Sequence, residues 1–574
     1  MPARDSAWRD AAPIVIALAA ILFFARLGTR ALWASEFRWA EIAREMLVTH
    51  NYFWPTLNGH VYYDKPLGSY WLVIAATWLT GGMNEAAARI PCAVAGLIAV
   101  ALVILLTRRL YDLRTGVFAA AVLATSFSFV FFSRHASADV ETVAGELAAL
   151  TLFLRYQHRP IGWWILALWI IMALTSLTKG LLGFVLPLLV IGVYSSFADG
   201  WNSFTGGMLL GSLSDRIGYA LERHRWFFNW RTPIAIAVAA SIYYWPFAIS
   251  HEQTGSAKGL AMVYRENVVR YFAPFDHVGP IYLYTYVIFA LMAPWSVYLP
   301  AALAHAHRAN QEARTERDRD RFVLSFFWAT FIFFTLAGSR RSYYLLPILP
   351  AAAILVARLL AEPLDRLSRT ARILLKLGFA AIVIAVTVSS LAFLPPRLFM
   401  PDPYALLPNA PERGVLAVYW IGSALALCWA LRRLTSARVF FATATVAWLF
   451  MFYFFVFAMP AGDAWRGEKP FAYRIRDLIG ADTAALAFYR VGGPVYYLDL
   501  PHSVPTYESR RELDQSINTG ATRWVVVRQR DLQILDVPAA VVAREAVFPW
   551  DSKEHRLNAM VLVRVGAPPA QESP

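Results

Sequence analysis

Long apolar runs separated by short polar segments dominate the chain from residue 12 to residue 459. A bilayer core of about 30 Å is crossed by about 20 apolar residues in an α-helix. Runs near that length occur at thirteen places: 12–29, 90–107, 116–134, 140–156, 162–178, 181–199, 232–250, 283–304, 322–337, 343–361, 374–394, 413–431 and 439–459. The pattern predicts an α-helical polytopic membrane protein with about 13 transmembrane helices.

Composition and charge support this interpretation. Of the 574 residues, 58% are hydrophobic and only 16% are charged, with a mean hydropathy of +0.46. Polar side chains are too few to cover the cores of a soluble chain of this length. The net charge of +14 is expected in basic loops facing membrane lipids and anionic lipid ligands, not in a nucleic-acid site. The two cysteines lie in apolar runs, which excludes a disulfide scaffold.

Loop charge decides how a fourteenth apolar segment, 67–80, is interpreted. With thirteen spans and the N-terminus inside, the basic loops, such as 308–321 and 358–376, are intracellular, as the positive-inside tendency requires. Counting 67–80 as a span would move these loops outside, so it is predicted to be a helix at the outer interface. The outside then receives 30–89, 135–139, 251–282, 338–342, 395–412 and all residues after 460.

Three other segments complete the predicted organisation. Residues 11–28 are expected to form a retained first helix and not a removable signal. The insertion 201–231 is predicted to carry an interfacial amphipathic helix. After residue 460 short apolar strands alternate with helices, which indicates a small outer α/β domain of about 110 residues. We therefore expect a membrane domain, 1–459, that includes the outer loop 30–89, and a C-terminal domain, 460–574.

The first outer loop carries two compact groups of charged and aromatic residues. Ser35 is a plausible N-cap for a helix that displays Glu36 and Arg38 near the membrane, where charges require partners or a role. Glu41 and Glu45 can pair with Arg38 and Arg44 at three- or four-residue spacing, which is also typical of a plain surface helix. Further along, Tyr62 and Lys65 form a good receptor for a phosphate group, although a lone lysine can also snorkel towards water.

Basic residues on the predicted outer side depart from the positive-inside tendency. They are Lys179, Arg265, Arg270, Arg340 and Arg341, and two tyrosines, Tyr343 and Tyr344, follow the last of them. An anionic ligand at the outer surface would explain them, because arginine grips phosphate in bidentate fashion and lysine adds a point charge.

Acidic and metal-ligating residues give weaker signals. Asp139 starts a predicted helix, where an acid can cap the helix or serve a site. Asp64 and His277 are external candidates for a metal, but no His-x-x-His or Glu-x-x-His pair accompanies them, and a loop histidine bound to backbone is the simpler interpretation of His277. No Gly-rich nucleotide loop occurs, so a nucleotide-sugar donor is not expected.

These motifs together resemble the lipid A aminoarabinose transferase family, polytopic glycosyltransferases that use lipid-linked sugars and are relatives of the protein O-mannosyltransferases. The resemblance is carried by Glu36-Phe37-Arg38-Trp39-Ala40-Glu41-Ile42-Ala43-Arg44-Glu45-Met46, Asn58-Gly59-His60-Val61-Tyr62-Tyr63-Asp64-Lys65-Pro66-Leu67, Asn84-Glu85-Ala86-Ala87-Ala88-Arg89-Ile90-Pro91, Asp139, Thr178-Lys179-Gly180 and the stretch 339–347. It runs through most of the membrane region in the family's order.

The resemblance implies a GT-C fold in the bacterial inner membrane. Such an enzyme moves a sugar from a polyprenyl phosphate to an acceptor at the periplasmic face, with lipid A or another lipopolysaccharide component as the expected acceptor. It also implies roles for individual residues. Tyr62, Lys65, Lys179, Arg270, Arg340 and Tyr344 would bind the carrier phosphate; Glu36, Arg38 and Asp139 would line the transfer site; a divalent metal would lie near Asp64, with His277 as a candidate partner.

One departure from the family pattern affects the expected chemistry. The family has an acid where this chain has Ser35. Either Glu36 takes over, or the acceptor needs no base, or the chain is catalytically altered. A phosphate oxygen is already anionic and needs orientation more than deprotonation, which favours a phosphate acceptor. A lipid-linked-sugar flippase, a transferase to protein and a non-catalytic lipid-binding scaffold remain as alternatives.

Overall fold

The computed structural model describes residues 2–33, 35–197, 208, 212–312, 314–393, 410–464, 467–535, 538–547 and 551–566. It divides into two compact units. Unit 1 comprises residues 1–27, 63–72 and 89–457, and unit 2 comprises residues 28–62, 73–88 and 458–574.

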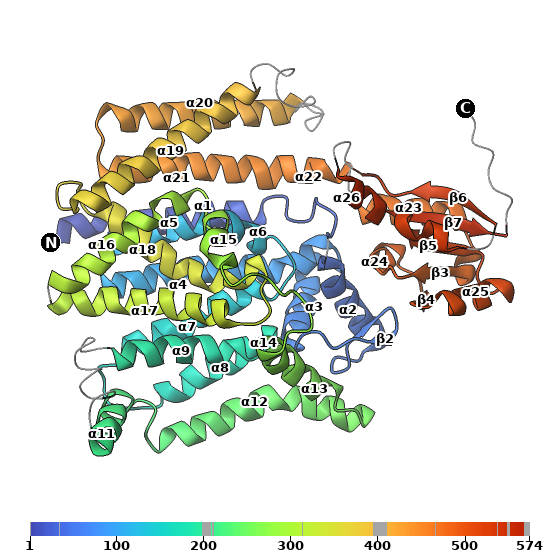
Figure 1. The fold of residues 1–574 in the computed structure, drawn as a ribbon, viewed down its shortest axis with the longest axis horizontal. Helices are drawn as coiled ribbons and strands as arrows, with labels where there is room; N and C mark the ends of the chain where they lie inside the picture. Colours follow the sequence, from blue (N-terminus) through green and yellow to red (C-terminus); the bar gives the residue numbers. More distant parts are fainter. Residues whose placement is uncertain are drawn as a thin grey trace. The chain divides into compact units, whose positions relative to one another are not determined.

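Unit 1 is a bundle of α-helices (Figure 1). Its longer members are α1 (Pro2–Phe24), α4 (Glu85–Leu110, from Arg89 on), α5 (Leu113–Ala124), α6 (Phe127–Ser133), α7 (Asp139–Tyr156), α8 (Trp164–Lys179), α9 (Leu182–Ser196), α11 (Leu213–Arg223), α12 (Arg231–Thr254), α15 (Leu283–Leu291), α16 (Leu299–Glu312), α17 (Arg314–Leu336), α18 (Leu349–Ala361), α19 (Arg369–Phe393), α20 (Ala410–Arg432) and α21 (Ser436–Tyr453). Shorter helical segments are α13 (Lys258–Tyr264), η2 (Arg265–Val269), α14 (Arg270–Phe272), η3 (Trp295–Tyr298), η4 (Ser342–Ile348) and η6 (Phe454–Ala458).

Every one of the thirteen predicted apolar runs coincides with a helix or with a pair of consecutive helices. Within the described ranges, six helices are long and apolar enough to span a membrane, and eight if each of two bent pairs counts as one span. The chain is therefore a multi-pass membrane protein, and the total of thirteen spans stays a prediction. The segment predicted at 67–80 is the helix α3 (Gly68–Thr80).

Helix α18 is deeply buried, with almost every residue inside the protein. It packs against α5, α16, α17 and α21. Both α18 and α5 carry runs of three alanines, Ala351–Ala353 and Ala119–Ala121. Small side chains let helix backbones approach closely in a membrane, where burial of apolar area adds little to association. This packing supports the elements that carry the site described below.

Unit 2 is an α/β domain with a five-stranded mixed sheet of order β4-β3-β5-β7-β6. The central strands β3 (Leu486–Tyr489) and β5 (Trp524–Arg528) are parallel, as are β3 and β4 (Thr506–Tyr507), whereas β7 (Met560–Val565) runs antiparallel to β5 and to β6 (Ala539–Arg544). The helices are α23 (Glu468–Ile479), α24 (Val495–Leu498), α25 (Arg510–Asn518) and α26 (Lys553–Asn558), and the short helical segments are α22 (Met459–Ala461), η7 (Gly462–Ala464), η8 (Asp482–Ala485) and η9 (Gln529–Ile534).

The predicted C-terminal elements agree with this fold except at one place. Residues 495–500 were expected to form a strand, but Val495–Leu498 is a short helix that begins directly after Pro494. Four buried apolar residues are too few to reveal a period of 2 or of 3.6, so the pattern could not separate the two structures. Pro494, as the first residue before the helix, provides a suitable φ angle for a helical start.

The outer loop 30–89 was expected to belong to the membrane domain, but residues 28–62 and 73–88 group with the C-terminal residues. Backbone N–H groups of Ala31 and Leu32 donate to Asp463 Oδ2 at 2.5 Å and to the Tyr497 hydroxyl at 2.6 Å. The hairpin β1 (Thr56–Leu57) and β2 (His60–Val61) turns through Asn58-Gly59, both with positive φ, as a two-residue hairpin turn requires. The Asn58 side chain also bonds the backbone N and O of Val504 at 2.8 and 2.7 Å.

Candidate functional site

The site in unit 1 starts at Lys65, immediately before α3. Its Nζ lies 3.2 Å from Asp64 Oδ1 and donates to the Asp64 carbonyl at 3.0 Å. Pro66 follows, and the fixed φ of proline limits the freedom of the backbone next to the lysine. Burial raises the pKa of the Glu266 carboxyl, on η2, and the positive charge of Lys65 opposes this shift. The lysine therefore pairs with Asp64 and acts electrostatically on Glu266.

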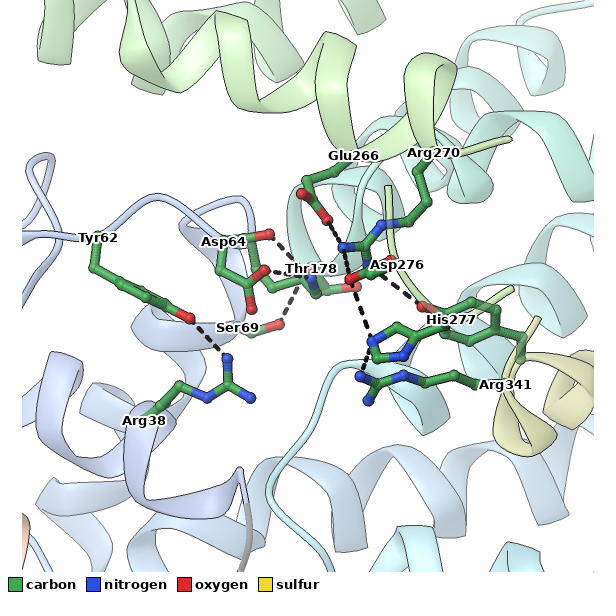
Figure 2. Close-up of polar contacts among 12 residues, drawn as sticks. Arg38, Tyr62, Asp64, Ser69, Thr178, Glu266, Arg270, Asp276, His277 and Arg341 are labelled. Carbon is green, nitrogen blue, oxygen red and sulfur yellow. Dashed lines mark hydrogen bonds and ion pairs between the residues drawn. The ribbon is translucent and has the colours of Figure 1, made fainter. Parts of the chain in front are cut away.

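Arg270 continues this ionic chain (Figure 2). Its Nη2 lies 3.1 Å from Glu266 Oε2 and 2.9 Å from Asp276 Oδ2, and its Nη1 donates to the Tyr344 hydroxyl at 3.3 Å. Glu266 and Arg270 are four residues apart across the π-helix η2, so their side chains lie on the same side of the segment. One guanidinium thus contacts groups from η2, from the following loop and from η4, which fixes its position.

Tyr344 joins Arg270 to a second ion pair. Lys179, the last residue of α8, pairs with Asp139, the first residue of α7, and its Nζ lies 5.7 Å from the centre of the Tyr344 ring. Asp139 was considered either a helix cap or a site residue. The N-cap of α7 is Ala138, and the Asp139 carboxylate meets the lysine.

Glu141 and Ser69 lie next to the elements that carry the Lys179–Asp139 pair. Ser69 donates to the Thr178 carbonyl at 2.8 Å, and its hydroxyl lies 3.4 Å from Glu141 Oε2. These contacts fasten the start of α3, which follows Lys65, to the end of α8, which carries Lys179. Both lysines are therefore positioned by the same small set of buried polar groups.

His277 and Arg341 extend the cluster on the other side of Asp276. His277 Nε2 lies 3.2 Å from Asp276 Oδ2 and contacts the Arg341 guanidinium, and Arg341 Nη1 donates to the Tyr343 hydroxyl at 2.9 Å. Burial, with Arg341 adding to it, lowers the pKa of His277. The backbone carbonyl of His277 accepts from Arg340 N at 2.8 Å, so its backbone and its ring are both engaged.

The suggested metal site is not formed by these side chains. In the parts of the chain that the structure describes, no three His, Cys, Asp or Glu side chains are grouped closely enough to hold a metal ion. The Asp64 carboxylate already faces Lys65, and the His277 ring faces the cationic Arg341. Because nearby cations oppose metal binding, Asp64 and His277 do not fit the metal, and no chemical step is derived from one.

Arg340 was expected to bind the carrier phosphate, but its guanidinium is used elsewhere. It donates to the Thr335 carbonyl from Nε and Nη2, at 3.1 and 3.0 Å, and to the Gly279 carbonyl from Nη1 at 2.6 Å. These bonds tie the loop after α17 to the loop before α15, where Val278 and Ser339 form an isolated β-bridge. The adjacent Arg341 is the residue that reaches the cluster.

This division of roles gives a testable difference between two neighbouring arginines. Arg340→Ala leaves two partly buried carbonyls without their donor and is expected to lower the melting temperature by several degrees while largely sparing substrate affinity. Arg341→Ala is expected to do the reverse and raise KM for the donor. Thermal unfolding in detergent and steady-state kinetics measure both. Equal losses of stability in the two variants would contradict the assignment.

The remaining predicted residues lie in unit 2, on and near α2 (Glu36–Thr49). The Glu36 carboxylate is fully buried and accepts from Arg30 Nη2 at 2.8 Å and from Trp33 N at 2.9 Å. Arg38 Nη1 donates to the Tyr62 hydroxyl at 2.7 Å. Ser35 precedes the helix but its side chain makes no capping bond, because its backbone is already helical.

The other acids of α2 form structural contacts in unit 2. Glu41 pairs with Arg44 at 2.7 Å, as its three-residue spacing predicts. Glu45 instead bonds the hairpin, at Thr56 and at the Gly59 backbone N–H. The expected pairing of Glu41 with Arg44 is therefore confirmed, and Glu45 contacts the hairpin.

The sequence analysis did not predict four side chains of the unit 1 cluster as site residues. They are Glu141, Glu266, Asp276 and Arg341, the last of which was noted only as an external arginine. Glu266 and Arg270 have the four-residue spacing of a helical ion pair, which was a readable signal. Asp276 stands in a loop with no period, so its distance from Arg270 depends on the path of the chain between them. No local sequence pattern predicts the contact between Asp276 and Arg270.

Comparison with known proteins gives matches to a family model, to curated relatives and to solved structures. The family model for dolichyl-phosphate-mannose-protein mannosyltransferases matches residues 12–253. An undecaprenyl phosphate-alpha-4-amino-4-deoxy-L-arabinose arabinosyl transferase of Pseudomonas aeruginosa (strain UCBPP-PA14) is 29% identical over 406 residues, which are 67% of this chain and 66% of that protein. Arabinosyl transferase 1 of Pseudomonas fluorescens (strain Pf-5) is 26% identical, over 62% of this chain and 60% of that protein. The chain thus matches slightly less than two thirds of these relatives.

The fold is similar to that of ArnT from Cupriavidus metallidurans, solved bound to undecaprenyl phosphate. The TM-score is 0.68 over 96% of this chain and 98% of that chain, with 20% sequence identity. The apo form of the same protein gives a TM-score of 0.68 at 19% identity. At this level of identity the similarity establishes the shared fold, which agrees with the GT-C architecture expected from the sequence.

Proposed function

We propose that the chain is a member of the lipid A aminoarabinose transferase family, a membrane glycosyltransferase that moves a sugar from a polyprenyl phosphate to lipid A; the similarities reported above support this proposal. The relatives named above act on an undecaprenyl phosphate-linked aminoarabinose, and a structure of similar fold holds undecaprenyl phosphate. The proposal places the site in the bacterial inner membrane, at the extracytoplasmic face.

One observation carries the proposal: the series of contacts from Glu266 through Arg270 and Tyr344 to Lys179, with Lys65 near enough to act electrostatically on Glu266. Cations that must be fixed near a membrane need anionic partners, and here each has one. A phosphate can displace or join these carboxylates without a change in the positions of the cations. Such prearranged cations cost little reorganisation when the ligand arrives.

The same cations favour the chemical step over simple binding. A polyprenyl phosphate-sugar carries one negative charge, and its phosphate gains a second as the glycosidic bond breaks. Lys65 and Arg270 therefore stabilise the transition state more than the bound donor. The acceptor attacks the opposite face of the anomeric carbon, so one C–O bond forms as the bond to the carrier phosphate breaks and the configuration inverts.

The acceptor side favours an anionic nucleophile. Ser35 cannot act as a base, and the Glu36 carboxylate is buried and bonded to Arg30 and Trp33 N. A lipid A phosphate oxygen carries its own negative charge, so it needs alignment and no proton acceptor. The departure at Ser35 is therefore compatible with an active transferase.

The test uses the purified full chain in detergent with an undecaprenyl phosphate-linked aminoarabinose and lipid A. Mass spectrometry should show lipid A gaining the mass of one sugar residue, with release of undecaprenyl phosphate. A flippase would show no transfer here, because detergent micelles offer no second leaflet. Transfer that is absent with lipid A but present with another envelope lipid would keep the enzyme class and overturn the acceptor.

A protein acceptor is the second candidate, favoured by the match of the mannosyltransferase family model to residues 12–253. Glycoproteomics of envelope proteins with and without this chain would separate the two acceptors. Sugar on serine or threonine of proteins, with unmodified lipid A, would support the second candidate.

A further inference from the structure

Helix α11 lies between two apolar helices at one end of the bundle. It follows α9, whose last residue is Ser196, and precedes α12, which is long and apolar enough to span the membrane. The Tyr219 hydroxyl donates to the Ser196 carbonyl at 2.5 Å, which holds α11 level with the end of α9 (Figure 1). No residue of α11 is buried in the protein. The helix is therefore exposed along its whole length beside the end of α9.

Apolar and charged residues of α11 lie on different faces of the helix. Leu213, Ile217 and Leu221 follow one another at four-residue spacing and are 74%, 51% and 48% exposed. At about 3.6 residues per turn they form a single stripe. Arg216 and Arg223 flank that stripe on one side, and Asp215 and Glu222 project from the opposite face of the helix. This distribution is typical of helices that lie in a membrane surface.

The arginines are placed where they can serve such an orientation. The aliphatic stem of an arginine can cover apolar surface while its guanidinium group extends towards lipid phosphates. The Arg223 guanidinium lies 5.6 Å from the Tyr219 ring, and Asp215 and Glu222 lie on the face opposite the stripe. A capping box between Ser212 and Asp215 stabilises the start of the helix without help from tertiary packing.

Exposed aromatic residues mark the same level at neighbouring helix ends. Trp163 precedes α8 and Trp230 precedes α12, and they are 54% and 61% exposed. The Arg231 guanidinium lies 4.5 Å from the Trp230 ring and 5.9 Å from the Trp163 ring. Tryptophan prefers the headgroup region of a bilayer, so these rings indicate the depth of the interface independently of α11.

We propose that α11 lies in the headgroup layer of the membrane, with its leucine and isoleucine stripe against the acyl chains and Arg216 and Arg223 bound to anionic phospholipid. This interaction surface is separate from the Lys65–Lys179 cluster and does not depend on the transfer reaction. Lipid is the occupant because the flanking helices, the aromatic residues and the arginines all place the stripe at the membrane surface.

The test is amide hydrogen exchange of residues 212–223 in the full chain. Nanodiscs of equal parts phosphatidylglycerol and phosphatidylcholine are compared with nanodiscs of phosphatidylcholine alone, each holding one copy. Ile217→Asp places a charge in the stripe. Gly218→Asp is the matched control, because it adds the same side chain one residue later, on the polar side, where a Cβ meets no atom within 4 Å.

We expect wild type and Gly218→Asp to exchange about tenfold more slowly in the phosphatidylglycerol discs than Ile217→Asp does. We also expect slower exchange with phosphatidylglycerol than without it, and loss of this difference in Arg216→Gln/Arg223→Gln. Equal exchange in the two aspartate variants would overturn the proposal. Protection that appears only in discs holding two copies would do so as well, and would identify a second chain as the occupant. Equal protection from exchange with and without phosphatidylglycerol would overturn the proposed binding of anionic phospholipid.

Discussion

Lys65→Ala is expected to lower the rate constant for sugar transfer about a hundredfold or more, the usual effect of removing one preorganised charge donor from a developing anion. The side chain pairs with Asp64 and acts electrostatically on Glu266. Its loss removes a cation and also leaves Asp64 without its counterion near the carrier phosphate. Because the phosphate gains charge during the reaction, kcat should fall more than the affinity for the donor. Single-turnover transfer and donor binding, measured separately, report the two quantities.

Two variants control for the lysine result. Lys65→Arg keeps the charge and should retain most activity, and Asp64→Asn removes the closest acid while leaving the lysine. If Lys65 only extends to water at the membrane surface, the alanine variant will keep near-normal turnover at unchanged melting temperature. That result would exclude Lys65 from the phosphate site while leaving the enzyme class open.

The helical part of the fold could be predicted from hydrophobic runs because a chain in lipid must satisfy its backbone hydrogen bonds within each segment. That constraint ties apolar length directly to helix. The grouping of residues 28–62 with the C-terminal domain could not be predicted, because it depends on single long-range bonds. Those between Asn58 and Val504, and between Lys469 and Glu85, join positions hundreds of residues apart.

The residues of the candidate site could be predicted where a charged side chain occurred at a position that the membrane topology disfavours. Lys65, Arg270, Tyr344, Lys179 and Asp139 stood out as charged or aromatic groups on the predicted outer side of the membrane. The structure joins the last four in one series of contacts, and it pairs Lys65 with Asp64. A charged side chain is costly near a membrane and requires a partner. Its position in the sequence therefore points to a site even when the partner is unknown.

The choice between Arg340 and Arg341 shows where sequence information ends. The two side chains are chemically equivalent and adjacent, so composition cannot separate them. The β-bridge between Val278 and Ser339, with the bond from Arg340 N to His277 O, sets the register of the two loops. In extended backbone successive side chains point to opposite sides, so this register turns Arg340 to the loop carbonyls and Arg341 to His277.

Arg270→Ala is expected to have the largest effect of any single substitution at the site, a loss of about a thousandfold in kcat/KM. Removal of one charge donor accounts for about a hundredfold of this. The rest arises because Glu266 and Asp276 both bind the same guanidinium, at 3.1 and 2.9 Å, and would repel the donor phosphate once this cation is removed. The kcat/KM of Arg270→Lys should lie between those of the wild type and the alanine variant. A lysine ammonium lacks the planar fork of a guanidinium and cannot reach all three partners at once.

The contribution of the unpaired acids can be isolated with a second substitution. Arg270→Ala/Asp276→Asn should recover about tenfold over the single variant, because an amide replaces one repelling carboxylate. Asp276→Asn alone should change transfer little, since Glu266 still pairs with the arginine. If the double variant is as slow as Arg270→Ala, repulsion by Asp276 is absent, and Arg270 acts through direct contact with the donor alone. If Arg270→Ala turns over at the wild-type rate, the ionic series from Lys65 to Lys179 does not bind the carrier phosphate.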